Sequence, residues 1–173
     1  NGDLVNILGN LVNRTVSMNK KYFEGIVQNH NIVEEIDSDL INSVTNLHNV
    51  VSSKMNELKV GEAIQEIIDV LRKCNKYIDD TTPWSLAKDE SKKERLGTVL
   101  YNLLESIRIC AVLLKPFLPD TGNKILEQLN THLIQDYIRH IQKMFQLEKM
   151  QKNIRFIIKL PVMIIIMSML PRQ

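Results

Sequence analysis

Two polar side chains near the start of the sequence, Asn10 and Arg14, have the types and the spacing needed to bind a nucleic-acid base. Side chains four residues apart on a helix lie next to each other. An amide supplies an acceptor and donors, and a guanidinium supplies further donors, so together they can hydrogen-bond to the edge of an unpaired base. The alternative is that both residues belong to an ordinary solvated face of a helix.

The run Thr82-Pro83-Trp84 holds the only tryptophan of the chain. Pro83 suits the first turn of a short helix that continues through residue 88, with Thr82 as its N-cap. A tryptophan fixed at such a corner is a suitable platform on which an unpaired base can stack. The alternative is a tryptophan buried in the core of the domain.

Signatures of catalysis and of metal binding are missing from the sequence. The six glycines are scattered, so there is no glycine-rich phosphate-binding loop. The four histidines and two cysteines lack the spacing of metal ligands. No serine, histidine and acid occur in order with the nucleophile-elbow or oxyanion-hole motif of a hydrolase. We therefore expect no catalytic residue, metal site or cofactor in this chain. We expect Cys74 and Cys110 to be reduced, buried thiols of a cytosolic protein.

The length of 173 residues and a content of 44% hydrophobic and 24% charged residues suit one folded domain. The charge is unevenly distributed, because residues 1–130 carry 15 basic and 18 acidic side chains, whereas residues 131–173 carry seven basic and two acidic ones. An acidic domain is not a general phosphate binder. Binding of RNA by residues 1–130 would therefore depend on local contacts.

Apolar side chains recur every three or four residues over most of residues 1–130, which predicts helices. No stretch alternates with a period of two, so the predicted fold is all-α, and long helices with short connections favour an antiparallel bundle. Ser91 and Glu94 have the form of a capping box at the start of a long, apolar helix, which we expect at the centre of the bundle. The predicted helices span residues 3–23, 36–58, 60–80, 83–88, 91–114 and 121–129.

The predicted bundle ends near residue 130, and residues 131–173 differ from it in charge and composition. Residues 160–170 are nearly all apolar, but this stretch is shorter than the roughly 20 consecutive apolar residues of a membrane helix. A reading-frame error that joined a foreign stretch to a genuine domain would explain the tail, and so would a divergent helical extension. In both cases we expect residues 131–173 to lie outside the core.

Three parts of the sequence resemble the anticodon-binding domain of the methionyl-tRNA synthetases, in the order and at the spacing of that family. They cover about residues 1–130. The tail shows neither of the family's usual continuations, a short link or a β-barrel appendage that binds tRNA. Because the chain starts without methionine in a helical pattern, we expect it to be a piece of a longer protein. The matching runs are DLVNILGNLVNRT (residues 3–15) with NKKYFEG (19–25), NKYIDDTTPWSLAK (75–88) and LLKPFLPDT (113–121).

The resemblance implies a helical domain that packs behind the Rossmann-type catalytic domain of a class I aminoacyl-tRNA synthetase and recognises the CAU anticodon of methionine tRNA. It implies that Trp84 stacks on the wobble cytosine and that Asn10 and Arg14 hydrogen-bond to base edges. It also implies that Asn75 and Asp79 line the same site. The parent enzyme would be cytoplasmic and would use ATP, and often zinc, through residues that lie outside this chain.

The sequence therefore predicts a tRNA-binding module that is inactive by itself. Its partners would be methionine tRNA and the catalytic domain of the same parent chain, and no membrane is expected. The rival hypothesis is a helical module that binds other proteins, or that associates with membranes through its tail. A buried Trp84, with Asn10 and Arg14 on different surfaces, would favour the rival.

Overall fold

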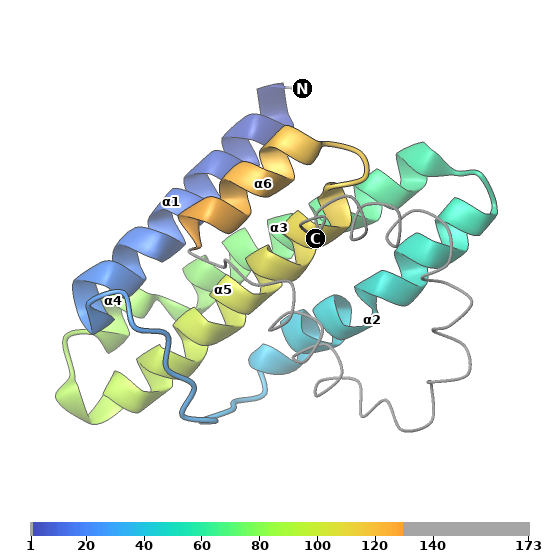
Figure 1. Cartoon of the computed structure of the whole chain (residues 1–173). Coiled ribbons are helices and arrows are strands. Elements are labelled where there is room, and N and C mark those ends of the chain that lie inside the picture. Colours follow the sequence, from blue (N-terminus) through green and yellow to red (C-terminus); the bar gives the residue numbers. More distant parts are fainter. Residues whose placement is uncertain (1, 130–173) are drawn as a thin grey trace, which may run out of the picture. The chain divides into compact units, whose positions relative to one another are not determined.

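A computed structural model of the chain describes residues 2–129, and this part contains helices and no strand. It confirms the predicted all-α fold, in which the chain runs back and forth along an antiparallel bundle (Figure 1). The predicted tail, residues 131–173, lies outside the described residues. The helices are α1 (Gly2–Phe23), α2 (Asp37–Asn56), α3 (Val60–Thr81), α4 (Pro83–Leu86), α5 (Lys93–Leu114) and α6 (Pro119–Gln128), with a 3-10 turn, η1 (Glu90–Lys92), before α5.

Helix α5 is the centre of the bundle, as the sequence predicted. It contacts α1, α2, α3, α4 and α6, and buried side chains occur around its whole circumference. Together with η1 it is long and apolar enough to span a membrane, but 72% of its most apolar stretch is buried, which is typical of a core helix. The largest fully buried side chains lie on α1, α3 and α5, and they include Leu11, Ile67, Leu71, Ile78, Leu96, Leu100, Leu103, Ile107 and Leu114.

The start of α5 differs from the predicted capping box at Ser91 and Glu94. Asp89 accepts hydrogen bonds from the Ser91 backbone N–H at 3.0 Å and from the Ser91 hydroxyl at 2.6 Å. Because a carboxylate is the stronger acceptor, it engages the Ser91 hydroxyl, and the chain makes one 3-10 turn before α5 begins at Lys93. The predicted capping box is therefore wrong, whereas the predicted end of this helix at Leu114 is confirmed.

Glycine and proline set two further helix ends. Helix α1 stops just before Gly25, as predicted, and Gly25 takes a positive φ of 84° that favours glycine. Helix α6 begins at Pro119, two residues earlier than predicted, because the fixed φ and missing N–H of proline suit a first helical turn. Gly122 then lets α6 approach α5 closely, since a Cβ there would lie 2.9 Å from the carbonyl oxygen of Ala111.

Residues 24–36, here named the strap, connect α1 to α2 and pass over the N-terminal half of α5. The backbone N–H of Ile32 donates to Thr98 Oγ1 on α5 at 3.1 Å. At Gly97 the strap comes so close that a Cβ would lie 2.8 Å from the His30 ring. Hydrogen bonds and close packing therefore hold the strap against the central helix.

Candidate nucleic-acid interface

A sharp corner at Thr82 joins α3 to α4. Thr82 has φ 42° and ψ 64°, a left-handed conformation that is rare for a β-branched residue. It also precedes Pro83, and a residue before proline disfavours helical backbone angles. The Thr82 side chain makes no capping hydrogen bond, so the prediction that it caps α4 is wrong. Strained residues of this kind occur mainly at functional sites, where their surroundings hold them in place.

Trp84 follows the buried Pro83 in α4 and is 42% exposed. A tryptophan in the core would be almost completely covered, so the alternative of a core tryptophan is wrong. The short helix that carries the indole packs on α5, the central and largely buried helix of the bundle. Trp84 thus presents an aromatic surface to solvent from a firm support, which is the arrangement that an unpaired base needs for stacking.

Arg14 and Asp79 form an ion pair at the surface. The distance between Arg14 Nη2 and Asp79 Oδ1 is 3.5 Å, and the two side chains are 46% and 67% exposed. Exposed ion pairs of this kind contribute little to stability, typically about 0–1 kcal/mol. Each group can therefore replace its partner by a ligand at small cost. The contact joins α1 to the last turns of α3, shortly before the corner that leads to Trp84.

Asn10 and Asn75 lie one helical turn before Arg14 and Asp79, on α1 and α3, which run in the same direction (Figure 1). Asn10 is exposed, whereas Asn75 is half-buried and its amide group donates to the carbonyl oxygen of Leu71 at 3.4 Å. The structure thus brings Arg14 and Asp79 into contact. Asn10 lies one turn before Arg14 on α1, and Asn75 lies one turn before Asp79 on α3. A role of these four side chains in binding stays a prediction.

Asp37, Arg95 and Tyr77 form a buried polar cluster, here named the buried cluster, which no pattern in the sequence had indicated. Arg95 donates from Nη1 and Nη2 to the two carboxylate oxygens of Asp37, at 2.7 Å each. The Tyr77 hydroxyl donates to Asp37 Oδ1 at 2.6 Å. The Asp37 side chain is fully buried, and that of Arg95 is 7% exposed. No local spacing could have revealed this cluster, because its contacts join positions 40 and 58 residues apart.

The buried cluster also holds the end of the strap. Arg95 Nη1 donates to the carbonyl oxygen of Ile32 at 2.9 Å, and Arg95 Nε lies 3.2 Å from Glu34 Oε1. The backbone N–H of Glu34 donates to Asp37 Oδ2 at 2.9 Å. No buried side-chain nitrogen or oxygen lacks a hydrogen-bond partner in the part of the chain that the structure describes. The strap, α2, α3 and α5 therefore share one fully satisfied polar network.

The charges of the buried cluster follow from its hydrogen bonds. Burial opposes ionisation of Asp37, but hydrogen bonds from Arg95, Tyr77 and the Glu34 N–H together outweigh it, so the pKa of the Asp37 carboxyl lies below its ordinary value. Burial, and then the hydrogen bond to Asp37, raise the pKa of the Tyr77 hydroxyl. At neutral pH the cluster therefore contains one carboxylate, one guanidinium and one neutral phenol.

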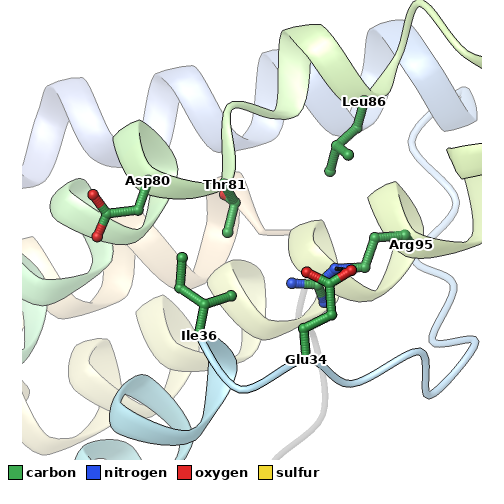
Figure 2. A pocket seen from close by; sticks show the side chains of 6 residues that line it. All are labelled: Glu34, Ile36, Asp80, Thr81, Leu86 and Arg95. Atoms are coloured by element: carbon green, nitrogen blue, oxygen red, sulfur yellow. Dashed lines mark ion pairs between the residues drawn. The ribbon is translucent and has the colours of Figure 1, made fainter.

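A shallow hollow lies between the strap and the α3–α4 corner (Figure 2). Figure 2 shows Leu86 and Arg95 toward one side of the hollow and Asp80 and Thr81 toward the other. Leu86 belongs to α4, the helix of Trp84. Arg95, whose guanidinium binds Asp37, therefore lines the same hollow as Leu86 of α4. The lining residues are Glu34, Ile36, Asp80, Thr81, Leu86 and Arg95.

Within residues 2–129, the cysteines and the acidic side chains show no arrangement for metal binding. Between residues 2 and 129, no group of three or more histidine, cysteine, aspartate or glutamate side chains could hold a metal ion. Cys74 and Cys110 are free and buried, as the sequence predicted. Burial raises the pKa of the Cys74 thiol to about 12 and also raises that of Cys110. Neither thiol has the exposure or the lowered pKa of a reactive cysteine.

Comparison with known families gives a match over most of the chain. The family described as the anticodon binding domain of methionyl tRNA ligase matches residues 27–159. This match continues beyond residue 130, where the sequence predicted the end of the domain. That boundary stays a prediction, because residues 130–173 lie outside the described part of the chain.

Individual relatives agree with the family match. The methionine–tRNA ligase of Clostridium acetobutylicum is 54% identical over 133 residues, which are 77% of this chain and 21% of that protein. The ligase of Bacillus subtilis is 44% identical over 130 residues, 75% of this chain and 20% of that protein. The crystal structure of free Mycobacterium tuberculosis methionyl-tRNA synthetase superposes with a TM-score of 0.68 at 34% identity, over 72% of this chain and 26% of that one. This chain thus spans about a fifth of the length of the curated relatives it matches.

Proposed function

Because the chain belongs to the family of anticodon-binding domains of methionyl-tRNA ligases, we propose that the surface around Trp84, Arg14 and Asp79 binds the CAU anticodon of methionine tRNA. In this proposal Trp84 stacks on the wobble cytosine. Asn10 and Arg14 hydrogen-bond to the edges of anticodon bases. Asn75 and Asp79 line the same site and restrict which bases fit there.

The exposed indole of Trp84 is the observation that carries this proposal. Stacking on an aromatic ring contributes to binding of any base, and it requires a ring that is both accessible and fixed. Trp84 meets both requirements, because it is partly exposed and lies directly after the buried Pro83. A buried Trp84 would have favoured the rival hypothesis of a protein-interaction or membrane module, and Trp84 is instead 42% exposed.

The charges of Arg14 and Asp79, shortly before the corner that leads to Trp84, suit base edges better than the phosphate backbone. Asp79 is an exposed carboxylate beside Arg14, and a carboxylate repels phosphates but accepts hydrogen bonds from the amino groups of cytosine and adenine. The guanidinium of Arg14 supplies donors for base oxygens and ring nitrogens. With 15 basic against 18 acidic side chains in residues 1–130, affinity has to come from such local contacts.

Replacing Trp84 by alanine tests the proposal. We expect the full chain with Trp84→Ala to bind a methionine tRNA anticodon stem-loop about 1–3 kcal/mol more weakly, the usual contribution of one stacked base. Trp84→Phe is the matched control, because it keeps an aromatic ring at the same position and should retain most of the affinity. Equal affinities of the wild type and Trp84→Ala would exclude the stacking role.

We further propose that the domain selects tRNA for a parent ligase of the cytoplasm, whose catalytic domain activates methionine with ATP. The support is the family match together with the short span of the relatives that this chain covers. The chain alone should then be inactive. Methionine-dependent exchange of pyrophosphate into ATP by the purified chain would contradict this expectation.

A further inference from the structure

We propose that the buried cluster of Asp37, Arg95 and Tyr77 positions the anticodon-binding corner, with Tyr77 and Arg95 acting as positioning residues that do not touch RNA. This inference rests on the proposed function of Trp84. The three residues lie far apart in the sequence. Because Arg95 and Tyr77 are both buried, their effect on a bound tRNA would be indirect.

The need for a positioning device arises from the backbone of Thr82. A β-branched residue with φ 42° that precedes a proline is strained. Strained backbone persists only where the surrounding structure holds it. The Thr82 side chain makes no capping hydrogen bond within α4, so the hold must come from the segments on either side of the corner. If the corner relaxed, Pro83 and Trp84 would move with it.

On the α3 side the hold is Tyr77. Its hydroxyl donates to Asp37 Oδ1 at 2.6 Å and accepts from the Asn102 amide at 3.3 Å, so it links the last turns of α3 to α2 and α5. Its backbone carbonyl accepts the Thr81 hydroxyl at 2.6 Å. Asp79 lies two residues after Tyr77. The orientation of the anticodon-facing end of α3 therefore depends on the Tyr77 side chain.

On the α4 side the support is α5, which packs against α4 and carries Arg95 near its start. The Arg95 guanidinium is fixed by two hydrogen bonds to Asp37 and one to Ile32. Arg95 and Leu86 line the same hollow (Figure 2), and Leu86 ends the short helix that begins with Pro83. The strained turn thus lies between Tyr77 of the buried cluster and α4, which packs on the helix that carries Arg95.

Stability alone is a poor explanation for this cluster. A buried ion pair often stabilises a fold no better than well-packed apolar side chains of the same size would. A bidentate arginine–carboxylate pair, however, fixes direction as well as distance. Here the pair joins α5 to the first residue of α2, and further hydrogen bonds connect it to the strap through Ile32 and to α3 through Tyr77. A geometric role for the corner accounts for a polar cluster where apolar packing would serve the fold equally well.

Two conservative variants test the inference in the full chain. Tyr77→Phe removes only the hydroxyl, and Arg95→Lys keeps the positive charge but loses the bidentate geometry. Val51→Ala on α2 is the matched control, because it removes buried apolar volume away from the corner. All are titrated with the methionine tRNA anticodon stem-loop at a temperature at which circular dichroism shows each variant to be folded, and Trp84→Ala is titrated in parallel.

Trp84 is the only tryptophan, so its fluorescence reports on the corner before RNA is added. For Tyr77→Phe and Arg95→Lys we expect affinity to fall about fivefold or more, the size of one lost hydrogen bond with a loosened site. We also expect easier quenching of the indole by acrylamide and an unchanged salt dependence of binding. Val51→Ala should lower the melting temperature but leave affinity and quenching as in the wild type.

The outcomes separate the two proposals. If Trp84→Ala weakens binding while Tyr77→Phe and Arg95→Lys bind and quench as the wild type does, the positioning role is wrong and the stacking role stands. If Val51→Ala weakens binding as much as the cluster variants do, the effect is one of general stability and the positioning role is again wrong. If Trp84→Ala itself binds as the wild type does, the proposed stacking function is wrong, and the positioning role that rests on it is wrong as well.

Discussion

Two arginine–aspartate pairs close to the α3–α4 corner have the same chemistry and opposite surroundings. Arg95 and Asp37 are buried, bidentate and 2.7 Å apart. Arg14 and Asp79 are exposed, with a single contact of 3.5 Å. In the buried pair both carboxylate oxygens and all three guanidinium nitrogens have partners within the domain, whereas the exposed pair keeps its hydrogen-bonding capacity for solvent or a ligand.

The difference shows how burial divides one type of interaction between two tasks. A buried charge that loses its partner has no water to replace it, so such a pair resists rearrangement. An exposed pair exchanges its partner for water with little change in free energy. We therefore expect the buried pair to govern folding and geometry, and the exposed pair to govern recognition.

The largest expected effect is on the free energy of unfolding of Asp37→Asn. The substitution leaves the buried Arg95 with only the exposed Glu34 as a countercharge, so we expect a loss of about 3–5 kcal/mol in chemical denaturation of the full chain. Asp39→Asn is the matched control on the same helix. Asp39 is an exposed acid paired with Lys73 at 2.9 Å, and its loss should cost no more than about 1 kcal/mol. Similar losses for the two variants would contradict the division of tasks.

The exposed pair should show the opposite pattern. Arg14→Gln should change the free energy of unfolding by less than about 1 kcal/mol, but it should reduce discrimination among anticodon variants by about 1–3 kcal/mol if Arg14 contacts a base edge. The measurement is a titration with stem-loops that differ only in the anticodon, at several salt concentrations. A uniform loss of affinity for all anticodons, with a reduced salt dependence, would identify Arg14 as a phosphate contact instead.

A smaller effect concerns acid. Because the pKa of Asp37 is lowered in the folded domain, its contribution to stability is complete above the ordinary value of about 3.9 and is lost as the pH falls through the folded value. The unfolding free energy of the wild type should therefore fall on acidification below about pH 4, by at most about 1.4 kcal/mol per pH unit from this group. Asp37→Asn should show a flatter dependence, and Arg14→Gln should keep that of the wild type. Equal slopes for Asp37→Asn and the wild type would show that Asp37 is not the group that titrates.

The helices could be predicted because their signals are local. The stripe of Leu96, Leu100, Leu103 and Ile107 is enough to predict a central helix, and all four side chains are buried there. The predicted start of that helix was wrong because two neighbouring capping signals compete. Asp89 lies two residues before Ser91 and takes its hydroxyl, so a pattern that considers only residues 91–94 assigns the wrong cap.

The site could be predicted only in part, because only some of its residues are marked by local signals in the sequence. Asn10 and Arg14 are neighbours by helical spacing, and Trp84 is marked by the preceding proline. The ion pair between Arg14 and Asp79, and the Asp37–Arg95 pair, join segments that meet only after the chain has folded. In the sequence Asp37 has the features of an ordinary acid in the first turn of a helix, and nothing local shows that it is buried.

The smallest expected effect is that of removing residues 131–173. Both pairs, the corner and the central helix all lie within residues 2–129. The removed residues also carry seven basic and two acidic side chains, unlike the acidic residues 1–130. If the domain ends near residue 130, truncation there should leave cooperative unfolding intact, with a change within about 0.5 kcal/mol, as for substitutions outside the core.

The truncation also decides between two views of the tail. The family match runs through residue 159, which favours a continuous domain, whereas the change of charge near residue 131 favours a boundary there. A continuous domain would bury apolar side chains of residues 131–159 against the bundle, and each such side chain contributes roughly 1.5–3 kcal/mol when it is fully buried. Loss of several of them would lower the melting temperature by many degrees and broaden the transition. Thermal melting of residues 1–130 against the full chain therefore separates the two views. A truncated chain that melts as the full one does would also show that the bundle, with its buried and its exposed pair, needs no contact from residues 131–173 for its stability.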